Sequence, residues 1–109
     1  MNKKELGKID NVFFGIRDDH FGIHFTFSGD GWGVSDYQGC WSPSHVKCTE
    51  HCKWTEEDRD KNMVKMCRFI DDLLYKAKVQ SVVKLLNIPV EVEFEDNQLK
   101  SWRILEEVL

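Results

Sequence analysis

The segment from His20 to Ser28, HFGIHFTFS, alternates strictly between apolar and polar side chains. A period of two residues places successive side chains on opposite faces of a β-strand. The same period recurs in Pro89–Glu95, PVEVEFE, where glutamates alternate with valines and a phenylalanine. Strands of this kind bury one face and leave the other in water, which is typical of an antiparallel sheet covered on one side. The two segments therefore predict a sheet with one apolar and one polar face.

The period changes to that of a helix between these two segments. Apolar residues recur every three or four positions from Thr55 to Lys78 and form one stripe on a helix. Thr55 is a suitable N-cap, and three acidic residues follow it where the helix dipole favours negative charge. Ser81 is a second N-cap, for a short helix that ends before Pro89, because a residue preceding proline is disfavoured in the α region. The stripe consists of Met63, Met66, Cys67, Ile70, Leu73, Leu74 and Ala77.

The remaining β-forming segments complete the predicted order of elements. Strands are expected at Lys8–Arg17, Gly31–Trp41 and Gln98–Glu107, whereas residues 1–7 read as a polar end outside the sheet. The order is then βββ-αα-ββ. This order predicts an α+β protein, an antiparallel sheet with one long and one short helix packed on one face, as a single domain over residues 1–109. The expected core consists of Phe21, Ile23, Phe25, Phe27, Met66, Ile70, Leu73, Leu74, Val90, Val92 and Phe94.

Composition narrows the class of protein. The chain has 109 residues, of which 41% are hydrophobic and 31% charged, the balance of a soluble globular domain. Its net charge of −4 disfavours a nonspecific nucleic-acid binder, which needs a cationic surface. The sequence has no apolar segment of membrane-spanning length and no signal-peptide region at its start, so we expect a cytoplasmic protein with no membrane partner. Cysteines in that compartment are thiols or metal ligands rather than disulfides.

One cysteine- and histidine-rich segment is a candidate metal site. Cys40, His45, Cys48 and Cys52 follow one another at short spacings, with His51 as an alternative ligand. Thiolates and imidazoles suit a tetrahedral structural zinc ion, and four protein ligands would leave no open position for a catalytic water. The spacing also allows two other readings: a redox pair, or ordinary thiols beside a small apolar strand residue. A zinc-stabilised module that contacts nucleic acid through nearby cations is an alternative function.

The glutamates Glu91, Glu93 and Glu95 form an acidic row on one face of a predicted strand. Such a row either contacts a basic surface of a partner protein or is a solvated sheet face. The motifs of nucleotide-binding loops, nucleophile elbows and zinc proteases do not occur in the sequence. The sequence therefore predicts a protein that is not an enzyme, with the acidic row as a candidate partner-binding site.

Four segments carry a resemblance to a known group of proteins: KIDNVFFG, SGDGWGV, CKWTEEDRD and IPVEVEFEDNQLKSWRILEEVL. Together they resemble a family of small proteins encoded by bacteriophages and prophages. The resemblance implies expression in a bacterial host and an accessory role, such as binding a host protein and inhibiting a defence or regulatory factor. It carries no catalytic residues to this chain. A third possible function is sequestration of a small ligand by aromatic side chains such as Trp41 and Trp54.

Overall fold

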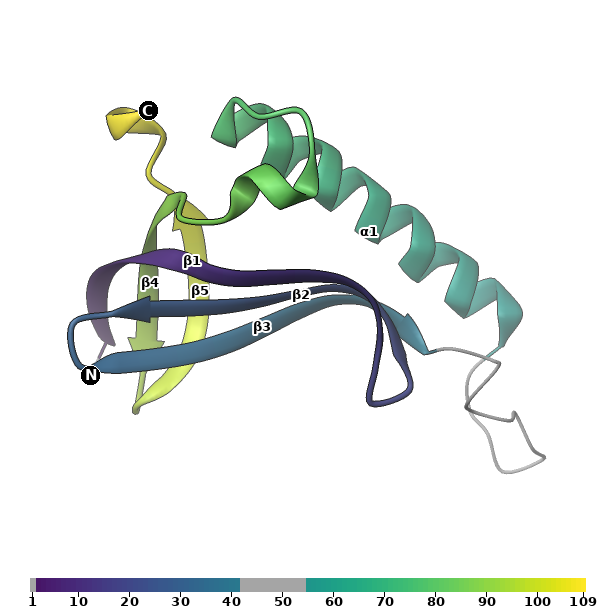
Figure 1. The fold of residues 1–109 in the computed structure, drawn as a ribbon. Helices are drawn as coiled ribbons and strands as arrows, with labels where there is room; N and C mark the ends of the chain where they lie inside the picture. The colour runs from purple at the N-terminus through teal and green to yellow at the C-terminus, as the bar shows by residue number, and fades with distance from the viewer. Residues whose placement is uncertain (1, 42–54) are drawn as a thin grey trace.

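The computed structural model describes residues 2–41 and 55–109 of the chain. The described part contains a five-stranded antiparallel sheet with the strand order β3-β2-β1-β4-β5 and one α-helix (Figure 1). The α+β class expected from the sequence is thereby confirmed. The elements in chain order are β1 (Asn2–Arg17), β2 (His20–Gly29), β3 (Trp32–Trp41), α1 (Glu56–Ala77), the 3₁₀ turn η1 (Val82–Leu85), β4 (Pro89–Glu95), β5 (Gln98–Ile104) and the 3₁₀ turn η2 (Glu106–Val108).

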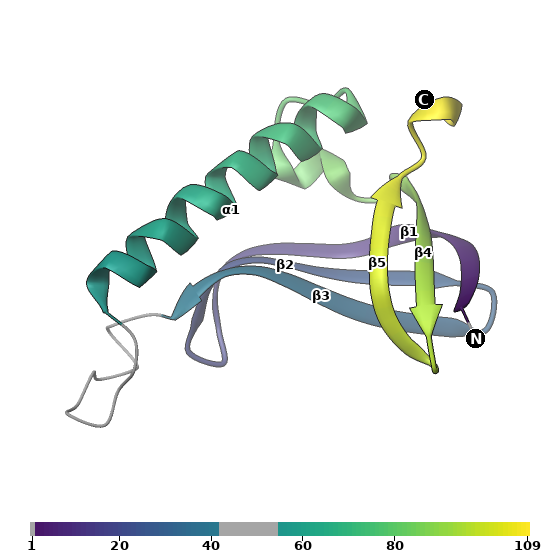
Figure 2. The ribbon, with the colours of Figure 1, turned by 180° about the vertical axis from the view of Figure 1, so that it is seen from behind.

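The longest strand, β1, joins the two halves of the sheet. Its residues 8–17 pair with β2, and its residues 2–8 pair with β4. A β-bulge lies where the pairing changes, between Ile9 and Asn11. A bulge bends its strand and increases the local twist. Figures 1 and 2 show the consequence: β4 and β5 run steeply across the direction of β2 and β3, so that the sheet curls over itself.

The curled sheet encloses the core on one face, which we call the inner face. Trp102 on β5 reaches across to β2, where its ring centroid lies 4.5 Å from Phe27 and 5.2 Å from Phe25. Its indole Nε1 donates a hydrogen bond of 2.7 Å to the carboxylate of Asp36 on β3. The contact closes the two halves of the sheet against each other. The buried residues of the core are Ile9, Ile23, Phe25, Phe27, Leu73, Ala77, Leu85, Val90, Val92 and Ile104.

The long helix predicted from residue 55 to 78 is present as α1. The Thr55 hydroxyl accepts a hydrogen bond from the Asp58 N–H, and the Asp58 carboxylate accepts one from the Thr55 N–H, which is a capping box. The helix ends at Lys78 in the left-handed conformation, with φ of 60°. Arg59 Nε donates to the carbonyl of Trp41 at 3.0 Å and ties the start of the helix to β3. None of the helices in the described residues is long and apolar enough to cross a membrane.

Two details of the predicted core need correction or refinement. Cys67 is exposed, although the stripe on the helix included it. Met66 is 2% exposed and points to the sheet, and successive helical residues lie about 100° apart, so Cys67 faces away. Four of the expected core residues are only half-buried at the rim of the core: Phe21, Ile70, Leu74 and Phe94.

The predicted second helix is wrong. After Ser81 the chain makes only one 3₁₀ turn, η1, of four residues, and the Ser81 hydroxyl accepts no cap hydrogen bond from the backbone of this turn. The segment is held instead by burial of Leu85, which is fully inaccessible to water. Asn87 adopts a left-handed conformation, with φ of 69°, and turns the chain into β4.

The prediction that the first residues lie outside the sheet is also wrong. Residues 2–7 belong to β1 and pair with residues 90–95 of β4. Their inward positions include Lys3 and Glu5, which are opposite Phe94 and Val92. Polar side chains at inward positions hide the two-residue period on which the prediction depended.

Candidate binding surface

Most of the candidate zinc ligands, namely His45, Cys48, His51 and Cys52, lie outside the described residues. Cys40 is described: it lies on β3 opposite Phe21 and is 3% exposed. Burial raises the pKa of its thiol, which disfavours the thiolate that a metal needs. The residues that the structure describes contain no group of three potential ligands close enough to hold a metal ion. Zinc binding stays a prediction, and metal analysis of the purified protein beside a Cys48→Ser, Cys52→Ser variant would test it.

The acidic row lies on one face of β4, as its alternation predicts, but cations of β5 lie beside it. Arg103 Nε lies 3.1 Å from Glu91, and Lys100 Nζ lies 3.6 Å from Glu93 and 4.0 Å from Glu95. Exposed pairs of this kind are each worth about 0–1 kcal/mol, but they screen the negative charge of the row. A basic partner would have to displace Lys100 and Arg103. Contact between the row and a basic partner stays a prediction.

A row of aromatic rings crosses β1, β2 and β3 on the face opposite the core, which we call the outer face. Phe13 pairs with His24, and His24 pairs with Tyr37, in the register of the three strands. The ring centroids of Phe13 and His24 lie 5.6 Å apart, and those of His24 and Tyr37 lie 4.8 Å apart. His20 makes an edge contact with Tyr37 at 5.3 Å. We call these four residues the aromatic ladder.

Two glycines make room for the ladder. Gly22 and Gly39 pair with each other on the outer face, beside the ring of Tyr37. A Cβ at Gly39 would collide with the backbone carbonyl of Phe21 and would lie 2.9 Å from the hydroxyl of Tyr37. That hydroxyl donates a hydrogen bond of 3.1 Å to the carbonyl of Cys40. The ring is therefore held along β3, with its hydroxyl anchored beside the glycine pair.

A cation, Arg17, lies beside the aromatic ladder. Burial raises the pKa of Tyr37 to about 12, and desolvation, aided by the charge of Arg17, lowers the pKa of His24. The guanidinium carbon of Arg17 lies 4.5 Å from the ring centroid of Phe13, a cation–π contact. Among the described residues no carboxylate pairs with Arg17. The surface thus combines apolar rings with one unneutralised positive charge.

A hollow of about 530 Å³ adjoins the ladder, lined in part by Arg17, His24, Ser35 and Tyr37. The Nε2 atom of His24 is buried and has no hydrogen-bond partner among the described residues. The alternation in the sequence predicted that the polar face of β2, which includes His20 and His24, lies in water, and it did not reveal the ladder. The signal was present, because a two-residue turn after residue 17 and another after residue 29 fix the register of all three strands.

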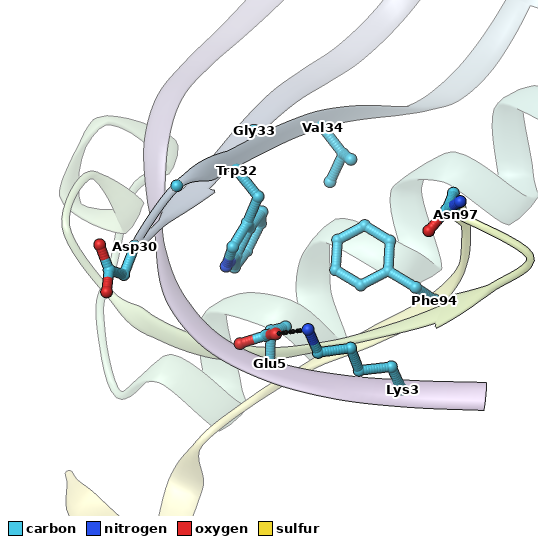
Figure 3. A pocket seen from close by; sticks show the side chains of 9 residues that line it. Lys3, Glu5, Asp30, Trp32, Gly33, Val34, Phe94 and Asn97 are labelled. Atoms are coloured by element: carbon cyan, nitrogen blue, oxygen red, sulfur yellow. Dashed lines mark ion pairs between the residues drawn. The ribbon is translucent and has the colours of Figure 1, made fainter. Parts of the chain in front are cut away.

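A second hollow, of about 370 Å³, lies at the other end of the curled sheet (Figure 3). The rings of Trp32 and Phe94 meet edge-to-face there, with centroids 5.4 Å apart. Lys3 and Glu5 form an ion pair of 2.9 Å below them, as Figure 3 shows. Of the two tryptophans that the sequence suggested for a ligand site, Trp41 is only 8% exposed and Trp54 lies outside the described residues.

Comparison of the chain with protein-family models, with curated proteins and with solved structures finds no match. The surfaces described above are therefore interpreted from their own chemistry.

The hydroxyl of Tyr37 is expected to titrate late. Its pKa is raised from 10.0 to about 12, so the folded protein holds this proton more tightly than the unfolded chain. The corresponding stability is present below pH 10 and is lost as the pH rises toward 12. An alkaline absorbance titration should show a tyrosinate forming near pH 12 in the wild type and not in Tyr37→Phe. Identical titrations of the two proteins would contradict the burial of this hydroxyl.

Proposed function

We propose that this chain is a non-enzymatic binding protein that docks onto another protein through the outer face of β1, β2 and β3. The observation that carries the proposal is the aromatic ladder beside Arg17, a cation without a carboxylate partner among the described residues. Aromatic residues and arginine are enriched in protein interfaces, because they bury a large area at low entropic cost. The complementary surface on the partner would present apolar side chains and a carboxylate.

The position of the outer face supports this role. α1 lies on the opposite side of the sheet, where its Phe69 contacts Phe25 of the core at 6.2 Å between ring centroids. Figures 1 and 2 show α1 and η1 on that same side. Phe13, His24 and Tyr37 are half-buried by one another and His20 is exposed, so the edges of the rings are accessible. A rigid sheet holds them in place before binding, which lowers the entropic cost of association.

The resemblance to phage and prophage proteins extends the proposal to a biological setting. We propose an accessory role in the cytoplasm of a bacterial host, with a host defence or regulatory protein as the partner. The acidic row is the alternative docking surface on the same protein. A zinc-stabilised nucleic-acid module is a second function, and its candidate ligands lie mostly outside the described residues.

Sequestration of a small ligand is a further candidate, supported by the hollow beside Trp32 and Phe94. A volume of about 370 Å³ with aromatic walls and one ion pair has the size and polarity of small-molecule sites. We rank it below protein binding, because the Nε1 atom of Trp32 is buried and does not offer its donor to the hollow.

The test uses the tagged full chain as bait in host-cell lysate, followed by binding measurements with each retained protein after purification. Ser35 is exposed on the outer face of β3 and lines the hollow beside the ladder. The Ser35→Glu variant places a negative charge where we expect a partner's carboxylate, because like charges across an interface disfavour association. We expect it to weaken binding about tenfold or more, which corresponds to about 1.4 kcal/mol.

Two matched variants complete the test. Tyr75→Ser changes a residue of α1 that is 84% exposed and remote from the outer face, and should leave binding unchanged. Glu93→Lys changes the acidic row instead. Loss of binding with Glu93→Lys but not with Ser35→Glu would assign the partner to the acidic row and overturn the proposed surface. Retention of duplex DNA by the bait, with no protein partner, would favour the nucleic-acid alternative.

A further inference from the structure

Within the part of the chain that the structure describes, β1 has a strand on only one side along its second half. β2 lies beside residues 8–17, and β4 lies on the other side beside residues 2–8 only. The backbone bonds on that side end at Ile9, whose N–H donates to the carbonyl of Ile88 at 3.0 Å and whose carbonyl accepts from the N–H of Asn87 at 2.8 Å. Among the described residues, no strand pairs with residues 11–17 there. We call this side of residues 11–17 the open edge.

The turn between β1 and β2 determines which backbone groups point to the open edge. Asp18 and Asp19 both have positive φ, 52° and 63°, as in a two-residue hairpin turn of type I′. Arg17 and His20 flank this turn and form its first pair. In such a hairpin the flanking residues exchange both backbone hydrogen bonds, and bonded and non-bonded pairs then alternate along the strands.

The alternation divides β1 into two sets of residues. Phe13 and Gly15, like Arg17, direct their N–H and C=O groups toward β2. Val12, Phe14 and Ile16 direct theirs toward the open edge. The side chains of these same three residues lie on the inner face, because Val12 and Phe14 pair with core residues of β2. The open edge therefore combines unpaired backbone groups with an apolar row of side chains.

The apolar row is exposed to solvent. Phe14 is 47% exposed and Ile16 is 42% exposed, although both belong to the central strand of the sheet. The ring of Phe14 contacts Phe21 with centroids 5.5 Å apart and extends the apolar surface onto β2. Natural proteins protect bare edges with lysine, proline, inward charges or a bulge. Residues 12–16 include no lysine, no proline and no inward-pointing charged residue, and the bulge lies before Asn11.

We propose that the open edge pairs antiparallel with the open edge of a second copy of this chain, with the two Phe14 residues opposite each other. Val12 then pairs with Ile16 of the second copy on each side of the two-fold axis, and each pair exchanges two backbone hydrogen bonds. A contact in which the same surface serves both subunits is the commonest form of homo-oligomer interface. This register gives the N–H and C=O groups of Val12, Phe14 and Ile16 hydrogen-bond partners at the same time.

The apolar surfaces of the two copies complement each other in this register. On the inner face, the valine, phenylalanine and isoleucine of one copy form a continuous row with those of the other. On the outer face, Phe13 falls opposite Gly15 of the second copy. The ring of Phe13 already covers Gly15 of its own chain, since a Cβ at Gly15 would lie 2.9 Å from Cζ of Phe13. Gly15 therefore brings no side chain of its own against Phe13 of the second copy.

The charges are complementary as well. Arg17 falls opposite Asn11 of the second copy and beside its Asp10, and the contact occurs twice by symmetry. Asp10 and Arg17 are both exposed, and neither forms an ion pair within the described part of the chain. Asp18 does not extend the strand toward Asp10, because its left-handed conformation begins the turn. The ends of the paired segment therefore attract each other.

The dimer goes beyond the proposed function and does not depend on it. Arg17 takes part in both, because its guanidinium has five N–H donors and can contact Asp10 of the second copy while still facing a carboxylate of the partner protein. A two-fold axis perpendicular to the sheet places both outer faces on the same side. The two aromatic ladders then lie on one continuous sheet of the order β3-β2-β1-β1-β2-β3. A partner that is itself dimeric would be bound at two points, which raises avidity without any new contact.

The test is sedimentation equilibrium of the full chain, combined with hydrogen exchange of individual amides. The wild type should sediment with twice the mass of one chain. Amides of Val12, Phe14 and Ile16 should exchange slowly in the dimer and faster on dilution. Those of Phe13 and Gly15 should not respond to dilution, because they are bonded to β2. An alternating response along a single strand is specific to this pairing.

Two variants and one control complete the design. Phe14→Pro removes an amide that points to the open edge and costs no bond within the chain, and Ile16→Lys introduces a natural edge-blocking residue. Each should weaken dimerisation about tenfold or more, whereas Phe14→Leu should stay dimeric. A wild type that sediments as a monomer at high concentration would overturn the proposal. So would a dimer in which the alternating exchange is missing or which both blocking variants, shown to be folded, leave intact.

Discussion

Replacing Phe27 with alanine is expected to lower the free energy of unfolding by about 3–5 kcal/mol, the range for buried phenylalanines in well-packed cores. Phe27 is completely buried and lies where the two halves of the curled sheet meet. It pairs with Ile9 of β1 and Val34 of β3, and its ring lies 4.5 Å from that of Trp102. Neighbours from three strands cannot all move into the space that the ring would leave, so a cavity is expected.

Urea unfolding of the wild type and Phe27→Ala measures this effect. The matched control is Tyr75→Ala, which also removes a six-membered aromatic ring but at a site that is 84% exposed. Surface changes of this kind usually alter the free energy by no more than about 0.5 kcal/mol. If Phe27→Ala and Tyr75→Ala unfold at the same urea concentration, β5 does not close over β2 as described.

The parts of the fold that the sequence predicted are those with a clear apolar period. The alternation in β2 and β4 and the stripe of α1 led directly to the observed elements. Residues 2–7 gave no such signal, since their inward side chains Lys3 and Glu5 line a hollow instead of the core. Their partner strand, β4, begins only at Pro89. A pairing between two segments so far apart in the sequence leaves no local signal in either of them. The curl of the sheet therefore could not be predicted from periodicity.

The candidate surface was harder to predict than the fold, because it depends on register across strands. The sequence places His20 and His24 on one face of a strand, but it does not by itself place Phe13 and Tyr37 on either side of them. That placement follows only from two tight turns, the first with Asp18 and Asp19 and the second with Gly31 at positive φ. The open edge is harder still to predict, because it depends on where the pairing of β4 with β1 ends. The sequence of residues 11–17 does not show that end point.

The second large effect on stability is expected at Gly7. This residue lies at the crossing, the point where β1 passes from its pairing with β4 to its pairing with β2. Gly7 lies next to Lys8, the residue that pairs with both β2 and β4. A Cβ at Gly7 would collide with the backbone carbonyl of Ser28 and would lie 2.7 Å from Cζ2 of Trp32. The carbonyl belongs to a paired strand, and the indole is enclosed between Gly7, Gly29 and Phe94. The Ser28 carbonyl is fixed by strand pairing, so even one methyl group overpacks the crossing and pushes the indole of Trp32 toward the hollow that it lines.

Gly7→Ala is therefore expected to destabilise the fold by about 1–3 kcal/mol, the usual cost of overpacking a close contact. The added methyl group would displace the indole of Trp32 from its packing against Gly7. The fluorescence of Trp32 should then report a more polar environment while the protein is still folded. Gly33→Ala is the matched control: its nearest atom, the carbonyl oxygen of Phe27, lies at an ordinary contact distance of 3.6 Å. That variant should unfold within about 0.5 kcal/mol of the wild type. Equal stability of the two glycine variants would mean that β1 does not pass so close to the β2–β3 hairpin, and the account of how the sheet curls would have to be abandoned.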